Sequence, residues 1–243
     1  MNKMDIVITM GGVGSRFKKA GFDKPKYMIE AKGKTLFEWS LISLSNFKEY
    51  ANQYIFIALK DNNSDIEAFI SQKCKSMNIE KFHTIIIDKL TDGQATTAMI
   101  AEKYWNSENP LFVYNIDTYI EPDGMNFYDI KGDGFIPCFV GEGNHWSFVK
   151  TDENGVATEV KEKERISDNC SIGGYYFKTC SLYKKLYNEY YKDSQNTING
   201  EKYIAPLYNL LINQGGKIYI SKISAEKVHV LGTPEELEIF IKN

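Results

Sequence analysis

Apolar, β-branched segments alternate with amphipathic segments through the first half of the chain. Their density of Ile, Val, Phe and Tyr predicts strands at residues 4–10, 53–60, 83–88 and 111–117. The amphipathic segments between them predict helices at residues 35–48, 64–78 and 95–106. Because strands joined through helices pair in parallel with right-handed crossovers, this order predicts a parallel sheet flanked by helices. Ligands of such sheets bind beyond the carboxyl ends of the strands, here the loops at residues 11–26, 88–95 and 115–121.

The second half of the chain has strand-like segments that lie closer together. They are found at residues 134–140, 146–151, 156–162 and 171–178, and their spacing predicts a small antiparallel addition to the sheet. Later segments predict helices at residues 180–192, 201–214 and 234–242 and a strand at residues 217–223. The expected fold class is therefore α/β, with a Rossmann-like, mixed but mostly parallel central sheet flanked by helices.

Composition and charge exclude several classes of protein. A formal net charge of −3 argues against a nucleic-acid partner, which would need a basic surface. The apolar segment at the start is too short for a signal peptide, and no segment approaches the roughly 20 apolar residues of a membrane span. We therefore expect a cytoplasmic protein that binds no membrane. The four cysteines form no CxxC pair, which favours reduced, buried thiols over a zinc site.

A glycine-rich loop follows the first predicted strand directly. Residues 11–17 read Gly-Gly-Val-Gly-Ser-Arg-Phe, and glycines allow backbone N–H groups to approach an anion closely. A P-loop would end in Gly-Lys-Ser/Thr, and a dinucleotide fingerprint would have glycine where Phe17 stands. Neither motif matches. Arg16 and Lys26 flank the loop, and this combination suits a triphosphate whose charge must be neutralised.

Six ordered motifs resemble those of the sugar-phosphate nucleotidyltransferase family, over essentially the whole chain. The glycine-rich loop followed by Lys24-Pro25-Lys26 resembles the family signature. The other five resembling segments are Asp92-Gly93-Gln94-Ala95-x-Thr97, Asn115-Ile116-Asp117, Glu162-Lys163, Ile172-Gly173-Gly174-Tyr175-Tyr176-Phe177 and Gly232-Thr233-Pro234-Glu235-Glu236-Leu237. The resemblance implies an enzyme that joins a nucleoside triphosphate to a small phosphorylated metabolite and releases pyrophosphate.

The resemblance also implies roles for particular residues. Arg16 would hold the departing pyrophosphate, Lys26 would contact the α-phosphate, and Asp117 would bind Mg²⁺, which prefers oxygen ligands. The nucleotide-binding residues would be Gly11, Gly12, Gly14, Ser15, Arg16, Lys26, Asp92, Gly93 and Gln94. The acceptor-binding residues would be Glu162, Lys163 and Gly174. We expect a single domain over residues 1–243, with residues 1–120 as the nucleotide-binding half and 121–243 as the acceptor-binding half.

One position departs from the family pattern. The family usually has a second carboxylate two residues before the late Gly-Thr, and this chain has Val230 there. Either Asp117 and the phosphates suffice for one metal ion, or another acid compensates, or metal binding is weaker. His229 is adjacent, but a histidine in an apolar run is more often structural than a magnesium ligand.

Nucleotide and acceptor are predicted on resemblance alone. The chain is similar to the stand-alone cytidylyltransferases of bacterial capsule clusters, which implies CTP and an acceptor such as L-glutamine phosphate. Five residues are candidates for binding a zwitterionic acceptor by position: Glu142, His145, Trp146, Glu201 and Lys202. A sugar 1-phosphate is the alternative acceptor. Two further alternatives are a metal-dependent glycosyltransferase, whose usual Asp-x-Asp is Asn115-Ile116-Asp117 here, and a nucleotide sensor without catalytic activity.

Overall fold

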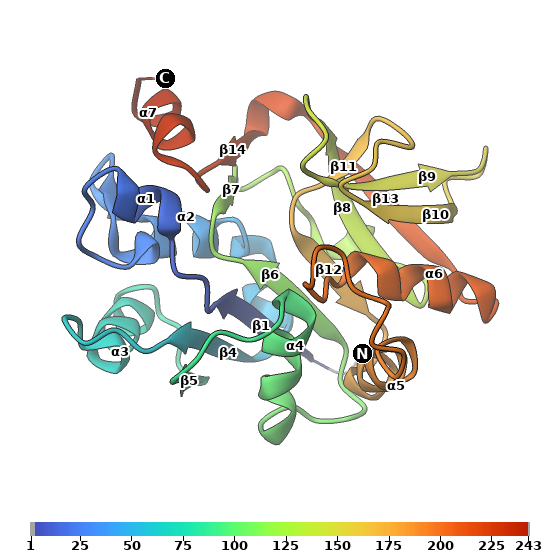
Figure 1. The fold of residues 1–243 in the computed structure, drawn as a ribbon, viewed down its shortest axis with the longest axis horizontal. Helices are drawn as coiled ribbons and strands as arrows, with labels where there is room; N and C mark the ends of the chain where they lie inside the picture. The colour runs from blue at the N-terminus through green and yellow to red at the C-terminus, as the bar shows by residue number, and fades with distance from the viewer. Residues whose placement is uncertain (1–2, 243) are drawn as a thin grey trace.

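Four parallel strands form one end of the central sheet in the computed structural model, which describes residues 3–242. They are β1 (Met4–Met10), β4 (Ala51–Leu59), β5 (Phe82–Ile87) and β6 (Leu111–Asn115). β1 lies between β4 and β6 and pairs in parallel with both, and β4 pairs in parallel with β5 (Figure 1). The predicted strands of the first half are thus confirmed, and their carboxyl ends meet at one edge of the sheet.

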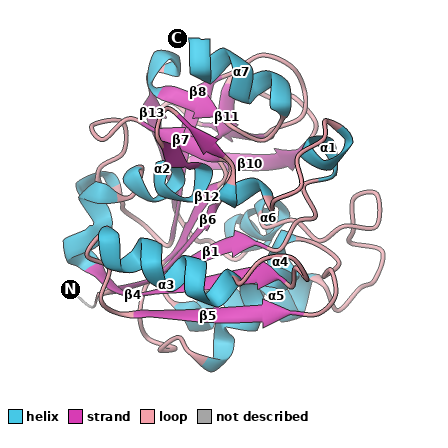
Figure 2. Ribbon diagram, turned by 90° about the vertical axis from the view of Figure 1, so that its left-hand side faces the viewer, coloured by secondary structure: helices cyan, strands magenta, loops and turns pink. Residues whose placement is uncertain are grey.

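Helices cover both faces of these strands. Because successive side chains of a strand point to opposite faces, Ile6 and Ile8 of β1 pack in one buried cluster and Val7 packs in the other. Figure 2 shows α3 (Ile66–Ser76) on one side of the parallel strands and α5 (Cys180–Tyr190) on the other. α2 (Leu36–Ile42) shares the face of α3, whereas α4 (Gln94–Met99) and α6 (Ala205–Asn213) share that of α5.

The second half of the chain extends the same sheet with mostly antiparallel strands. β12 (Gly174–Phe177) pairs antiparallel with β6 and with β8 (Gly134–Val140), and the strands beyond are β9 (Ser147–Thr151), β10 (Ala157–Glu162) and β11 (Asn169–Ser171). β13 (Ile218–Ile223) pairs in parallel with β8 and completes a ten-stranded sheet. The predicted α/β fold with a mostly parallel core and an antiparallel addition is confirmed.

Four predicted elements have clearly different boundaries in the structure. The strand expected at residues 171–178 is divided, because Gly173 adopts a positive φ of 81° between β11 and β12. The helix expected at residues 201–214 begins only at Ala205, since Pro206 lies in its first turn. The helices expected at residues 35–48 and 95–106 end at Ile42 and Met99, and each is followed by a 3₁₀ helix.

Several short elements have no counterpart in the sequence prediction. They are α1 (Ser15–Lys19), β2 (Glu30–Ala31), β3 (Lys34–Thr35), β7 (Thr118–Ile120) and β14 (Val228–Val230), and the 3₁₀ helices at Lys26–Met28, Phe127–Asp129 and Ala225–Lys227. Two further 3₁₀ helices, Ser45–Tyr50 and Ile100–Lys103, overlap the helices predicted at residues 35–48 and 95–106. β14 pairs antiparallel with β7 and leads into α7 (Pro234–Lys242). All four cysteines are free and buried. Within residues 3–242, no helix has the length and apolar character needed to cross a membrane.

A capping box is present at the start of α2. The Glu38 amide donates to Oγ1 of Thr35 at 3.3 Å, and the Glu38 carboxylate accepts from the Thr35 amide at 2.8 Å. Thr35→Ala should lower the free energy of unfolding by about 1 kcal/mol, because one helix-end N–H loses its acceptor. Thermal melting should show a fall of about 2–4 °C. Thr35→Ser keeps the oxygen and is the control; an equal loss in both variants would contradict this role of the hydroxyl.

Candidate functional site

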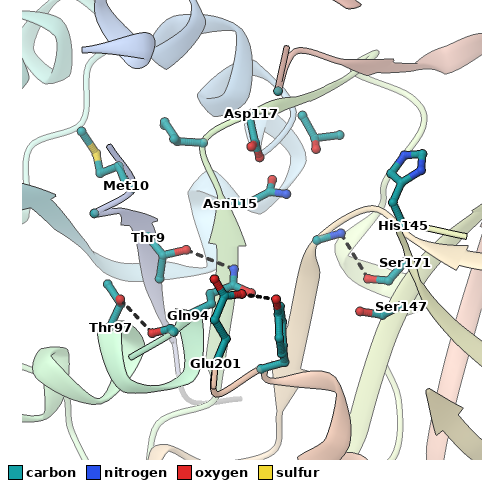
Figure 3. Close-up of a pocket in the computed structure, with 18 of the residues that line it drawn as sticks. Thr9, Met10, Gln94, Thr97, Asn115, Asp117, His145, Ser147, Ser171 and Glu201 are labelled. Atoms are coloured by element: carbon teal, nitrogen blue, oxygen red, sulfur yellow. Dashed lines mark hydrogen bonds between the residues drawn. The ribbon is translucent and has the colours of Figure 1, made fainter. Parts of the chain in front are cut away.

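A cleft of about 620 Å³ lies at the carboxyl ends of the parallel strands (Figure 3). The three loops predicted at the carboxyl ends of the strands, residues 11–26, 88–95 and 115–121, all contribute to its wall. Segments from the second half of the chain complete the wall. Among the predicted site residues, those lining the cleft are Gly11, Gly12, Arg16, Lys26, Gly93, Gln94, Asp117, Glu162 and Lys163. The structure therefore brings together residues that are spread over some two thirds of the sequence.

The glycine-rich loop turns the chain from β1 into α1. Gly14 is the N-cap residue of α1 and has a positive φ of 62°, a conformation that glycine adopts readily. Phe17 is 1% exposed and fixes the short helix against the core, which leaves Arg16 at the cleft. Gly14 and Ser15, two of the predicted nucleotide-binding residues, are not among the lining residues.

Lys26 and Asp117 form the central ion pair of the cleft. Lys26 Nζ lies 2.5 Å from Asp117 Oδ2, and the two side chains are 17% and 28% exposed. Pro25 precedes the 3₁₀ turn that begins with Lys26, and Asp117 follows β6. The pair places a cation and a carboxylate side by side in a partly buried site, where the lysine attracts phosphates and the carboxylate attracts metal ions.

Asn115 adds an oxygen without a hydrogen-bond partner. Its Oδ1 is buried and unpaired, and the residue lines the cleft two positions before Asp117. The side chain packs against Gly173, where an added Cβ would lie 2.0 Å from Asn115 Nδ2. Gly174, one of the predicted acceptor-binding residues, is buried in β12 against Phe112, and its neighbour Gly173 lines the cleft instead.

The first turn of α4 is hydrogen-bonded to β1 and to the glycine that precedes it. Gln94 Nε2 donates to Thr9 Oγ1 at 3.1 Å, and Thr97 Oγ1 donates to the carbonyl of Gly93 at 3.0 Å. Gly93, with a φ of 139°, is the N-cap residue of α4, which has no side-chain cap. Asp92 does not line the cleft, because its carboxylate accepts from Thr96 and pairs with a lysine of a later loop.

A chain of hydrogen bonds fixes Glu162 in the second half of the cleft. Ser147 Oγ, which lies 2.9 Å from the Tyr175 hydroxyl, donates to the Glu162 carboxylate. Burial raises the pKa of Glu162 above its usual range, and the Ser147 hydrogen bond and the Lys163 charge oppose this rise, whereas Glu201 adds to it. The Ser147 hydrogen bond and the Lys163 charge therefore offset only part of the cost of burying the ionised Glu162 carboxylate.

Lys163 contacts an aromatic residue of the loop before α6. Its Nζ donates to the hydroxyl of Tyr203 at 2.5 Å and lies 4.6 Å from the ring centroid. The Tyr203 hydroxyl in turn donates to the Glu201 carboxylate. Of the zwitterion candidates, His145, Trp146 and Glu201 line the cleft, whereas Glu142 and Lys202 do not.

Sequence reasoning missed several residues of the cleft. Thr9 and Ser147 lie in no motif, and their positions near the ends of predicted strands were the available signal. Tyr175 lies in the Ile172–Phe177 motif, but no role was assigned to it. Glu236 also lines the cleft, and its carboxylate accepts from the Gly232 amide at 3.0 Å. Val230 lies in the lining as an apolar residue, whereas the neighbouring His229 pairs with Glu121 at 3.2 Å outside it.

Fold and cleft together define an α/β protein whose ligand site lies at the carboxyl edge of a mostly parallel sheet. No family model matches the chain. A solved nucleoside-diphosphate-sugar pyrophosphorylase from Vibrio cholerae is 36% identical with a TM-score of 0.88, over 98% of this chain and 100% of that one. The chain belongs to the sugar-phosphate nucleotidyltransferase family.

Other relatives support the fold or match only a short segment. The inositol-1-phosphate CTP transferase from T. maritima is 15% identical with a TM-score of 0.75, over 100% of this chain and 98% of that one. The CTP:phosphocholine cytidylyltransferase from Streptococcus pneumoniae is 13% identical with a TM-score of 0.70, over 99% of this chain and 98% of that one. At such identities these two matches bear on the fold alone.

One curated protein matches part of the chain. It is a probable UDP-N-acetylglucosamine pyrophosphorylase of Encephalitozoon cuniculi, 40% identical over 68 residues. The matched segment is 28% of this chain and only 16% of that protein's length.

The raised pKa of Glu162 predicts a pH-dependent cost in stability. A carboxyl group whose pKa is higher in the folded state destabilises the protein above that pKa, and this cost disappears below the ordinary glutamate range. Glu162→Gln should therefore raise the melting temperature at pH 7, by roughly 1–4 °C, with the difference vanishing near pH 4. Melting curves between these pH values measure the effect. Exposed Glu164→Gln is the control; a gain for Glu162→Gln that persists at pH 4 would exclude ionisation as its cause.

Proposed function

We propose that the protein transfers a nucleoside monophosphate from a nucleoside triphosphate to the phosphate of a small acceptor and releases pyrophosphate. The observation that carries this proposal is the Lys26–Asp117 pair beside the glycine-rich loop, in one cleft with Arg16. Membership of the family and the match to the Vibrio cholerae pyrophosphorylase support it. A triphosphate needs several cations and backbone N–H groups converging at one place, and this cleft supplies them.

The reaction is an in-line displacement at the α-phosphorus. An oxygen of the acceptor phosphate forms the new bond, the bond from the α-phosphorus to the bridging oxygen breaks, and the electron pair leaves with pyrophosphate. Lys26 neutralises charge on the α-phosphate, and Arg16 binds the departing pyrophosphate with its planar guanidinium. The rate acceleration therefore comes mainly from positioning the two substrates and neutralising their charge, and it requires little covalent chemistry from the protein.

A divalent cation, Mg²⁺, belongs to this proposal. The Asp117 carboxylate and the unpaired Oδ1 of Asn115 are both oxygen donors in the cleft, the ligand type that Mg²⁺ prefers. These residues would hold the ion, with substrate phosphates and water completing its shell. When bound, it would withdraw charge from the phosphates during transfer. Val230 contributes no ligand.

We assign residues 1–120 to the nucleotide and residues 121–243 to the acceptor. Gly93 and Gln94 lie toward β1 and suit the base, because the Gln94 amide offers both a donor and an acceptor. Lys163 and Glu162 lie across the cleft and suit the acceptor's phosphate and polar groups. The narrower assignment is CTP as nucleotide and a phosphorylated amino acid, such as L-glutamine phosphate for capsule synthesis, as acceptor.

An acceptor with an ammonium group fits the lining of the second half. Glu162 and Glu201 are both carboxylates of this wall, and the aromatic rings of Trp146 and Tyr203 lie in the same wall. Carboxylates and aromatic faces both attract a cation. A sugar 1-phosphate is the second candidate, favoured by the sugar-nucleotide relatives. A glycosyltransferase or a catalytically inactive sensor would release no pyrophosphate.

Lys26→Ala should lower turnover at least about 100-fold, because charge on the α-phosphate is no longer neutralised. Pyrophosphate release, followed with Mg²⁺ over a matrix of triphosphates and phosphorylated acceptors, measures it. Lys24→Ala is the control, since this exposed lysine lies two residues earlier and outside the cleft. Near-normal turnover in a folded Lys26→Ala protein would refute the assignment.

Phosphoethanolamine and 2-hydroxyethyl phosphate form a matched pair of probes, since they differ only in ammonium against hydroxyl. We expect a higher kcat/KM for phosphoethanolamine, and Glu201→Gln should reduce that preference by about threefold to tenfold, as for a partly exposed ion pair. Glu142→Gln is the control, because Glu142 is exposed outside the cleft. Equal rates for both probes in the wild type would favour the sugar 1-phosphate.

A further inference from the structure

We propose that Asp92 and Lys202, the Asp92–Lys202 latch, are positioning residues that couple binding of the nucleotide to binding of the acceptor. The proposal rests on the proposed function, because it assigns one loop of the latch to the base and the other to the acceptor. Neither residue lines the cleft, so neither contacts a substrate directly.

The backbones of the two loops are joined on both sides of Lys202. The Lys202 amide donates to the Asp92 carbonyl at 2.6 Å, and the Ala95 amide donates to the Lys202 carbonyl at 3.1 Å. An added Cβ at Gly93 would lie 2.2 Å from the Lys202 carbonyl oxygen. The loops are therefore in direct backbone contact, although more than 100 residues separate them in sequence.

The side chains add a charged contact between the same two residues. Lys202 Nζ lies 2.8 Å from Asp92 Oδ2, and the lysine is 22% exposed. Its Nζ also lies 5.8 Å from the ring centroid of Tyr187 and 5.4 Å from that of Tyr191. The hydrogen bond with Asp92 raises the pKa of Lys202. Burial would raise the pKa of Asp92, but Lys202 and Thr96 lower it below its usual range, so both residues are charged at neutral pH.

Each loop of the latch carries cleft residues immediately beside it. Gly93 and Gln94 follow Asp92, and Gln94 is hydrogen-bonded to β1. Tyr203 follows Lys202, and its hydroxyl accepts from Lys163 at 2.5 Å. A displacement of Lys202 therefore shifts Tyr203 and the ammonium of Lys163 together. These are groups that we assign to the acceptor.

This arrangement couples binding of the nucleotide to binding of the acceptor. A nucleotide that orders the Gly93 loop also orders the Lys202 backbone bonded to it, so a subsequent acceptor has less ordering to induce. Thermodynamic linkage makes the effect reciprocal, and the acceptor must tighten nucleotide binding by the same factor. Asp92, which the sequence placed among the nucleotide-binding residues, acts in this way through the loop and without touching the base.

The test uses Lys202→Met, which keeps the aliphatic stem, and Asp92→Asn, which keeps an acceptor for Thr96. Calorimetry without Mg²⁺, so that no transfer takes place, measures the Kd of CTP with and without phosphoethanolamine, and steady-state kinetics with Mg²⁺ give the acceptor KM and kcat separately. We expect the wild type to bind CTP at least fivefold more tightly with the acceptor present. Either variant should reduce this factor below twofold and raise the acceptor KM at least fivefold with kcat within about twofold. Because the pair acts as a unit, the double variant should resemble either single one.

Lys178→Met is the control, since it removes a 3.1 Å ion pair with Asp133 outside the cleft. Lys202→Arg should restore the coupling, which separates the charge from any effect on folding. An acceptor KM that stays unchanged while the melting temperature falls would show a purely structural role and overturn the proposal. A wild type whose Kd for CTP is independent of the acceptor would also overturn it. Absence of pyrophosphate release from every substrate pair would instead refute the proposed function.

Discussion

Parallel pairing between β1 and β6 is the constraint on which the cleft depends. In this register Thr9 lies beside Asn115, so the two strands end at the same edge of the sheet. The glycine-rich loop and the Asp117 segment leave that edge next to each other, although about 100 residues lie between them. The Lys26–Asp117 contact is then a local consequence of the sheet. Loss of this register would separate the cation from the carboxylate before any side chain was changed.

Much of this architecture was predictable because its signals are local. Strand periodicity and the rule that strands joined through helices pair in parallel both depend on neighbouring segments, and the structure confirms the parallel strands that they predict. Two of the boundaries that were wrong depend on single residues with special backbone properties. Gly173 divides a predicted strand by its positive φ, and Pro206 sets the start of α6.

The site was less predictable where it depends on contacts between distant segments. The motifs of the sequence contain most of the residues that line the cleft at the carboxyl edge of the sheet. They could not show that Gly174 is enclosed by Phe112 while its neighbour Gly173 contacts Asn115, because strand register decides which glycine meets which side chain. The partner of Asp92 was equally hidden, since the loop containing Lys202 lies between α5 and α6, more than 100 residues further along the chain, and carries no motif.

The close approach at Gly93 has an evolutionary consequence. Any side chain at this position would overlap the backbone of Lys202, whatever its chemistry. A descendant sequence that replaces the glycine must therefore lengthen, shorten or displace the segment before α6 at the same time. Residues 92–95 and 201–203 should then vary together across related chains as a single inherited unit.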